Sequence, residues 1–326
     1  MAPSARVRLI DVNHALDRRG LLFGASAYFI WGLFPIFMAA LMPAGAFEIV
    51  AHRALWSLVV CVIIVTVVRK WRRVRTVMSD RVTMLRLTAA AALIGINWGV
   101  MVYAVVTERV ASTSLGYYIN PLLTVALSVV FLGERLRRLQ MVAISIATVA
   151  VVILGLELGG LPWIALTLAS TFALYALIKK GVGSKVDALT GLTVETAVMV
   201  PAVAIILWLV ARSGAQTFLV RGEEGLGLTH DLLLAFTGVW TAGALIVFAA
   251  GARRLPLNIM GLLQYIAPTM TFLLAVWYFN EPMSPARWSG FALVWLALVL
   301  ITVDSWRSRT RRKGEAAAAG EVTEPV

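Results

Sequence analysis

Charged residues are scarce in this chain. They make up 14% of its 326 residues, whereas hydrophobic residues make up 60%. A soluble domain is normally about a quarter charged and no more than about half apolar, so this chain has too few charges to cover a water-facing surface. The composition therefore argues against one or two ordinary soluble domains and indicates a membrane protein.

Cysteine and histidine are also scarce. The single cysteine, Cys61, lies inside an apolar run, which excludes a disulfide framework and a cysteine-based metal site. The three histidines are too far apart in sequence for zinc-ligand spacing, and no GxxxxGK[ST] phosphate loop is present. We therefore expect no metal, no cofactor, no catalytic residues and no direct use of ATP.

Ten apolar stretches of about the length needed to cross a bilayer follow one another along the chain. The connections between them are short, and the longest, about 212–230, leaves no room for a soluble domain. The ten stretches are 21–42, 48–68, 83–106, 111–133, 139–157, 161–180, 188–211, 231–251, 257–280 and 286–305. We predict an all-α, polytopic membrane protein with ten transmembrane helices.

The basic residues fall on alternate connections. Of the 29 Lys and Arg residues, 24 flank the spans on one side and only 4 on the other. Because basic connections stay in the cytoplasm, this bias places both termini on the cytoplasmic side. Nucleic-acid binding would need basic residues spread over a folded polar surface. The net charge of +12 therefore reflects membrane topology, with the lipid bilayer as partner.

Two proline-containing segments resemble one another. They are "GYYINPLLTVALSVVFLGE" at 116–134 and "LLQYIAPTMTFLLAVWYFNE" at 262–281. A shift of 147 positions aligns their tyrosine, proline and final glutamate. The aligned pairs are Tyr118 with Tyr265, Pro121 with Pro268, and Glu134 with Glu281. These are the fourth and ninth spans, so they run in opposite directions across the membrane.

A second similarity extends the repeat. "GASAYFIWGL" at 24–33 resembles "LASTFALYAL" at 168–177, in the first and sixth spans. We predict two inverted five-helix repeats, 21–157 and 161–305, between cytoplasmic tails at 1–20 and 306–326. The last dozen residues, small and polar, are predicted to be disordered. Inverted repeats are typical of secondary transporters with a substrate site near the midplane, although a duplicated scaffold without a transport role is the alternative.

The two aligned prolines are expected to kink their helices. Pro121 and Pro268 lack a backbone N–H, which frees carbonyl groups at membrane depth. Such breaks are tolerated where the backbone lines a cavity or is satisfied by neighbours. Breaks at matching positions of two halves favour a transport site, and ordinary packing kinks are the alternative.

The sequence resembles the EamA-type permeases of the drug/metabolite transporter superfamily, and within it the RarD group. The resemblance covers about residues 20–305 and rests on several motifs in order. They include "AYFIWGLFPIF" (27–37), "EIVAHRALWS" (48–57), "NWGVMVYAV" (97–105), "FLGERLRRLQ" (131–140) and "GLLQYIAPTMTFLLAVWYFNEPM" (261–283). The resemblance implies a ten-helix bacterial inner-membrane permease that moves small metabolites or drugs, usually outwards.

Arg53 is a charged residue inside a predicted span, where insertion scales give a cost of about 2.5–3.5 kcal/mol. Its guanidinium can bind a carboxylate or phosphate with two hydrogen bonds. Alternatively, it reaches the outer interface or pairs with Glu48. The neighbouring His52 either titrates near neutral pH or is a structural hydrogen-bonding residue.

Other polar residues in the spans also leave two interpretations open. Glu195 either carries a coupling proton or cation, or pairs with a basic residue near the cytoplasmic side. Asn97 is either an interhelical hydrogen-bonding residue or a ligand. Glu134 and Glu281 lie at span ends, where we expect terminal anchors or pairs with basic residues such as Arg135 or Arg287.

The remaining candidates for substrate contact are aromatic residues and the residues around the two prolines. Aromatic side chains can stack on an aromatic or cationic substrate, but most of those in spans are packing residues or interface anchors. The candidates are Trp31, Trp98, Tyr175, Tyr118, Asn120, Pro121, Gln264, Tyr265 and Pro268.

These features predict a secondary transporter of a small molecule, driven by an ion gradient or by exchange. An intramembrane lipid-modifying enzyme is an alternative, but it would need a cluster of acids or histidines, and only Arg53, His52 and Glu195 are available. A channel is a third possibility. The sequence leaves the oligomeric state open, with a homodimer among the alternatives.

Overall fold

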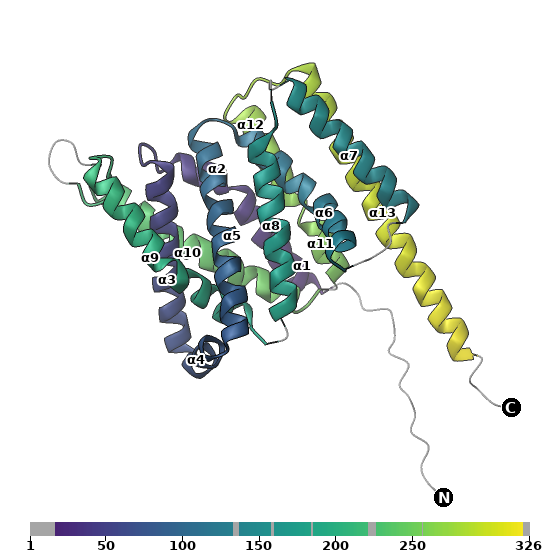
Figure 1. Ribbon diagram of the computed structural model, residues 1–326, viewed down its shortest axis with the longest axis horizontal. Helices are drawn as coiled ribbons and strands as arrows, with labels where there is room; N and C mark the ends of the chain where they lie inside the picture. The colour runs from purple at the N-terminus through teal and green to yellow at the C-terminus, as the bar shows by residue number, and fades with distance from the viewer. Residues whose placement is uncertain are drawn as a thin grey trace, which may run out of the picture.

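The computed structural model describes residues 17–132, 137–157, 160–183, 185–220, 226–255 and 257–321. All regular secondary structure in these ranges is helical, as predicted. The helices form a bundle in which α7 and α13 lie side by side along one edge (Figure 1). They are α1 (Arg18–Gly32), α2 (Phe34–Ala39), α3 (Ala46–Val67), α4 (Trp71–Ser79), α5 (Arg81–Val106), α6 (Val110–Leu132), α7 (Arg138–Glu157), α8 (Trp163–Val182), α9 (Ala188–Arg212), α10 (Gly227–Ala252), α11 (Leu257–Leu263), α12 (Ile266–Trp277) and α13 (Pro285–Glu321).

Eight helical stretches in the described ranges are long and apolar enough to cross a membrane. The helix α8 adds a shorter apolar stretch, Trp163–Lys179. Each of the ten predicted spans overlaps one or more of the helices. The total of ten transmembrane helices nevertheless stays a prediction.

Two predicted spans are interrupted. The ninth consists of α11 and α12, which are separated at Gln264 and Tyr265, shortly before Pro268. This is where a missing proline N–H leaves a carbonyl without its helical donor. The first span is broken at Leu33, before Pro35 at the start of α2. The sequence analysis did not anticipate this second break.

Pro121 behaves differently from Pro268. It lies inside α6, which continues without interruption from Val110 to Leu132. The fourth span is therefore not divided in two as the ninth is, and the kink expected at Pro121 stays a prediction. This helix packs against α8 and α12, just as the ninth span packs against α1 and α6, so these contacts do not account for the difference.

Two helical segments were not predicted. The basic stretch after the second span forms α4, whose Val74 and Val77 are buried beside α5 and α9. At the other end of the chain, α13 extends well beyond residue 305 to Glu321. The prediction of a disordered tail is wrong for residues 314–321, because this stretch is rich in alanine, the strongest helix former.

The main packing contacts join helices from the two predicted halves. The helix α3 packs against α9 and α10, α5 against α8 and α9, and α1 against α10 and α12. In addition, α6 packs against α8 and α12, and α7 against α13. If each span is exchanged for the one five places along the chain, this set of contacts is unchanged. The two halves are therefore interleaved rather than separate bodies.

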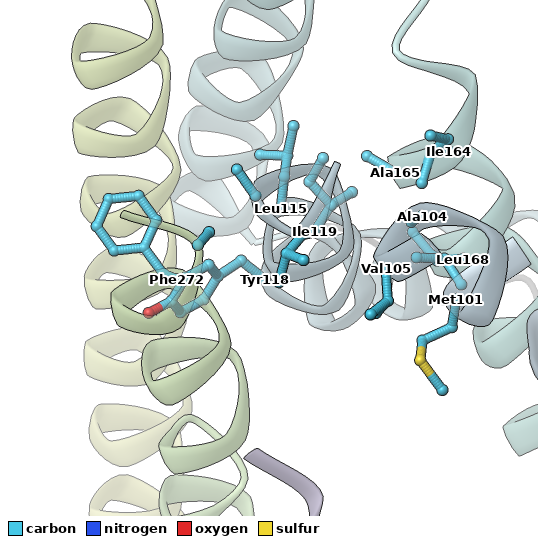
Figure 2. Packing of buried hydrophobic residues seen from close by; sticks show 14 of the residues in the cluster. Met101, Ala104, Val105, Leu115, Tyr118, Ile119, Ile164, Ala165, Leu168 and Phe272 are labelled. Atoms are coloured by element: carbon cyan, nitrogen blue, oxygen red, sulfur yellow. The ribbon is translucent and has the colours of Figure 1, made fainter. Parts of the chain in front are cut away.

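Glycines permit the closest of these crossings. A Cβ on Gly116 of α6 would lie 2.9 Å from the Ala165 carbonyl oxygen and 2.9 Å from Leu168 Cβ on α8. Figure 2 shows Ala165 and Leu168 beside Ala104, Val105 and the α6 residues Leu115 and Ile119. Small residues at helix crossings are the usual means of close packing in membranes.

Gly238 of α10 marks the tightest crossing, with α3. A Cβ at this position would collide with the carbonyl group of Trp56 and lie 2.6 Å from Ser57 N. These are backbone atoms, which cannot move aside as the end of a flexible side chain can. The backbones of α3 and α10 therefore stay in contact only with glycine at this position.

We predict that Gly238→Ala lowers the free energy of unfolding by on the order of 3 kcal/mol, as overpacking does. Gly243→Ala, on the same helix, is the matched control, because a Cβ there meets nothing within 4 Å. Thermal unfolding of the two purified variants in detergent measures the difference. Equal melting temperatures would show that the α3–α10 crossing is not close-packed.

Candidate functional site

Arg53 of α3 lies at the contact between the two halves. It is only 6% exposed, and its Nε donates a hydrogen bond of 3.1 Å to Thr241 Oγ1 on α10. Its Cζ lies 4.3 Å from the ring centre of Phe34, just after the break in the first span, and 4.0 Å from that of Trp98 on α5. Two aromatic rings thus stack against the guanidinium, and its hydrogen-bonded Nε points to the second half.

The described part of the chain leaves Arg53 without a counter-ion and one of its terminal nitrogens without a hydrogen bond. Nη1 is buried without a hydrogen bond, and no carboxylate there lies within 4.0 Å of Arg53. The phenol of Tyr117 on α6 is a further polar group close enough to interact with the charge. The arrangement leaves a buried cation with hydrogen-bonding capacity to spare.

The structure argues against both structural alternatives for Arg53. The carboxylate of Glu48 instead accepts hydrogen bonds from Thr217 N, Phe218 N and Thr217 Oγ1, at 2.8–2.9 Å. Glu48 therefore holds the segment between α9 and α10 rather than the guanidinium. Since Arg53 is buried, it does not reach an interface either.

Glu195 of α9 lies in a second charged cluster. Its Oε1 accepts a 2.6 Å hydrogen bond from Lys179 Nζ on α8, and its Oε2 accepts one of 3.2 Å from the Tyr175 hydroxyl. Glu195 is 1% exposed. The structure thus brings together two predicted residues and supplies a basic partner on the neighbouring helix.

A row of aromatic rings connects the two clusters. Tyr117 contacts Phe172 edge-on with 6.4 Å between ring centres, and Phe172 contacts Tyr175 at 6.0 Å. Tyr117 belongs to the first predicted half, and the other two belong to the second. Arg53 and Glu195 are therefore linked through the contact between the halves, without touching.

Asn97 joins α5 to α8. Its Nδ2 donates hydrogen bonds of 3.0 Å to the Leu168 carbonyl oxygen and to Thr171 Oγ1, both on α8. Both amide hydrogens are thus used between α5 and α8, and none is left for a ligand. Of the two interpretations of Asn97, the structure supports the interhelical hydrogen bond.

The side chains of His52 and Trp31 contact residues other than Arg53. His52 Nδ1 accepts a 3.2 Å hydrogen bond from Trp56 Nε1, and its ring lies 4.4 Å from Phe218. These contacts favour the structural interpretation of His52. Trp31 packs against Tyr28 and Phe248, with ring centres 5.3 Å and 5.5 Å away.

The candidates around the two prolines lie on α6 and at the break between α11 and α12. Tyr118 of α6 shares a 2.7 Å hydrogen bond with Thr269 Oγ1, and Ser114 Oγ donates one of 2.8 Å to the Pro268 carbonyl oxygen. Asn120, beside Pro121, has a buried Oδ1 without a partner, while Gln264 and Tyr265 form the break itself. This region joins the two halves, and no hydrogen bond or ring contact links its described residues to Arg53.

Comparison with known proteins agrees with this arrangement. The profile of the EamA-like transporter family matches residues 18–156 and again residues 160–303. The chain belongs to the EamA-like transporter family. Protein RarD of Streptomyces exfoliatus is 46% identical to it over 95% of this chain and 97% of that protein.

Other EamA relatives extend over nearly the whole length. The uncharacterized transporter YojE of Bacillus subtilis is 40% identical over 92% of this chain and 99% of its own. Protein RarD of Escherichia coli is 37% identical over 90% and 97%. A crystal structure with 19% identity aligns with a TM-score of 0.55 over 88% of this chain and 98% of the other, which indicates a shared fold. The chain is thus a multi-pass membrane protein of a transporter family.

Sequence reasoning missed three residues around Arg53 in this EamA protein: Phe34, Tyr117 and Thr241. Thr241 follows Trp98 by 143 positions, the same interval that separates Gly95 from Gly238. An alignment of the third and eighth spans would therefore have pointed to Thr241 as the counterpart of a residue already chosen. Within the described residues, no group of three or more His, Cys, Asp or Glu side chains could hold a metal ion.

Glu281 of the EamA chain binds the start of α6, not Arg287. Its carboxylate accepts hydrogen bonds from the backbone N–H groups of Val110 and Ala111. Arg287 pairs instead with Glu157, at 3.2 Å. Glu281 therefore anchors one half to the other at a helix N-terminus, where a carboxylate is favoured. Its predicted counterpart, Glu134 with Arg135, lies outside the described residues.

Glu281 lies between spans, and burial raises its pKa from 4.5 to about 7, with Glu108 adding to the shift. The two backbone donors and Arg287 oppose the rise without cancelling it. The folded protein holds this proton up to about pH 7, whereas an unfolded glutamate releases it near pH 4.5. This contribution to stability is therefore present at low pH and is lost as pH rises through that window.

We predict that the melting temperature in detergent falls between about pH 4.5 and 7, and that Glu281→Gln removes part of this fall. Ser284→Ala, in the same segment, is the control because it changes no titratable group. An identical pH dependence in wild type and Glu281→Gln would contradict the raised pKa.

Proposed function

We propose that this protein is a bacterial inner-membrane secondary transporter that moves a small metabolite or drug, outwards, by alternating access. Its ten spans form two inverted five-helix halves, 21–157 and 161–305, with both termini in the cytoplasm. The observation that carries the proposal is a buried, incompletely bonded arginine at the contact between the halves. The guanidinium of Arg53 joins Thr241 of the other half and has donors to spare.

The location of this group supports transport better than it supports the alternatives. A midplane site between repeats is reached from either side when the halves change their packing. The symmetric set of contacts between the halves supports two near-equivalent arrangements. An intramembrane enzyme needs a group that can transfer protons or attack a bond near the substrate. Around Arg53 the described side chains are aromatic rings and hydroxyls.

The driving force is an ion gradient or exchange. Glu195 is the candidate for proton coupling, because it is a buried carboxylate joined to the Arg53 cluster by aromatic rings. Lys179 neutralises it in this conformation at 2.6 Å. Coupling therefore requires that this pair separate during the cycle, so that Glu195 takes up a proton when it loses its cation.

The transport proposal predicts saturable exchange. Compounds that raise the melting temperature of the purified protein are screened first, since binding to the folded state stabilises it. Their labelled forms are then taken up by proteoliposomes loaded with the unlabelled compound. We expect Arg53→Gln to reduce this uptake at least tenfold, and Arg212→Gln, at an exposed helix end, to leave it within about twofold. Flux that never saturates would indicate a channel, and chemical conversion would indicate an enzyme.

For coupling, we predict that Glu195→Gln abolishes the acceleration of uptake by a pH gradient while exchange persists. Glu157→Gln is the control, because it removes a carboxylate from the ion pair with Arg287 and leaves the Glu195 cluster unchanged. Acceleration that survives in Glu195→Gln would exclude this residue as the proton carrier.

A further inference from the structure

Within the described residues, most buried charged side chains have partners in the chain. Lys179 neutralises Glu195 at 2.6 Å, and Arg137 pairs with Asp304 at 3.1 Å. Glu48 accepts three hydrogen bonds. Arg53 is 6% exposed, yet the described residues offer it no carboxylate and a single hydrogen bond. An isolated charge in a low-dielectric interior is strongly destabilising unless a counter-ion joins it.

The unsatisfied part of Arg53 has a definite shape. Phe34 and Trp98 cover the guanidinium with their rings, and Thr241 takes up Nε. The terminal edge that carries Nη1 remains, with Nη1 buried and unbonded. A planar group with two acceptor oxygens can bind the terminal nitrogens of a guanidinium with two parallel hydrogen bonds.

We infer that the transported substrate is an organic monoanion and that its carboxylate binds the terminal edge of Arg53. The inference rests on the proposed transport function and specifies its substrate class. One carboxylate balances the charge of Arg53, whereas a phosphate dianion would leave a net negative charge in the same apolar surroundings. The flanking rings and the nearby Tyr117 favour a substrate whose body is aromatic or apolar.

The first test compares matched ligands on the purified full-length protein. The probes are aromatic carboxylates paired with their amides, such as benzoate with benzamide and indole-3-acetate with indole-3-acetamide. Phenyl phosphate, inorganic phosphate and chloramphenicol complete the set. We expect the carboxylates to raise the melting temperature with at least tenfold higher affinity than their amides. Arg53→Gln should abolish the difference, and Arg53→Lys, which keeps the charge but lacks the planar fork, should retain part of it.

The second test needs no ligand. Arg53→Gln removes a buried charge without a counter-ion, so the empty protein should melt at a higher temperature than wild type. Lys179→Gln is the matched control. It strands the buried carboxylate of Glu195, so the melting temperature should fall. A lower melting temperature in Arg53→Gln would show that the arginine is a structural residue balanced inside the chain.

The outcomes separate this inference from the transport proposal. If the amides or chloramphenicol bind and exchange as well as the carboxylates, and Arg53→Gln has no effect, the substrate is not held as an anion although the protein transports. If phenyl phosphate binds more tightly than benzoate, the anion is a phosphate and the carboxylate assignment is wrong. If carboxylates bind at Arg53 but none is exchanged across proteoliposomes, the anion site stands and the transport proposal fails.

Discussion

Everything in this structure depends on how closely helices of the two halves approach one another. Lipid tails give apolar helices no hydrophobic reason to associate, so close packing has to hold them together. At one crossing, Gly116 of α6 faces Leu168 of α8. At the equivalent crossing, Gly24 of α1 faces Leu263 of α11, whose Cδ1 lies 2.7 Å from a Cβ built on the glycine. In the aligned repeats, Gly24 corresponds to Leu168 and Leu263 to Gly116. Each crossing therefore pairs one small with one large residue. The glycine is on α6 in the first crossing, but on α1, the counterpart of α8, in the second.

At the crossings of α3 with α10 and of α5 with α9, the glycines lie on equivalent members, but the chemistry is asymmetric. Gly238 crosses α3 at Trp56, and Gly95 crosses α9 at Met199. Both members of the second pair differ from those of the first by 143 positions, so the crossings are equivalent. The interval that relates Trp56 to Met199 also relates Arg53 to a threonine on α9. The glycine is thus duplicated whereas the charge is not, and one half supplies the cation while the other supplies hydroxyl groups.

The sequence was sufficient for the helices and for part of the site. Long apolar stretches predicted the helical segments because a bilayer leaves few other solutions for the backbone. Arg53 was found because a charge inside a span is costly, and Glu195 for the same reason. Lys179, the partner of Glu195, lies at the end of a predicted span. A basic residue at a span end indicates only the topology of the chain, so the pair was not predicted. The roles of Asn97 and Glu281 depend on helices far away in sequence, so local patterns could not distinguish a bond to α8 or α6 from a bond to a ligand.

The two aligned prolines have different effects on their helices, although both spans pack against helices of the other half. Around Pro121, α6 is packed between α8 and α12. The ninth span instead stops at Gln264 and resumes as the 12-residue helix α12. Polar contacts then hold α12 and the segment after it to α6, through Ser114, Tyr118 and Glu281. Any separation of the halves at this end has to exchange those hydrogen bonds for water. A hydrogen bond exchanged for water costs only about 1 kcal/mol. The free energy needed to move a short helix beyond a break is therefore small compared with the free energy that the close-packed crossings contribute to stability.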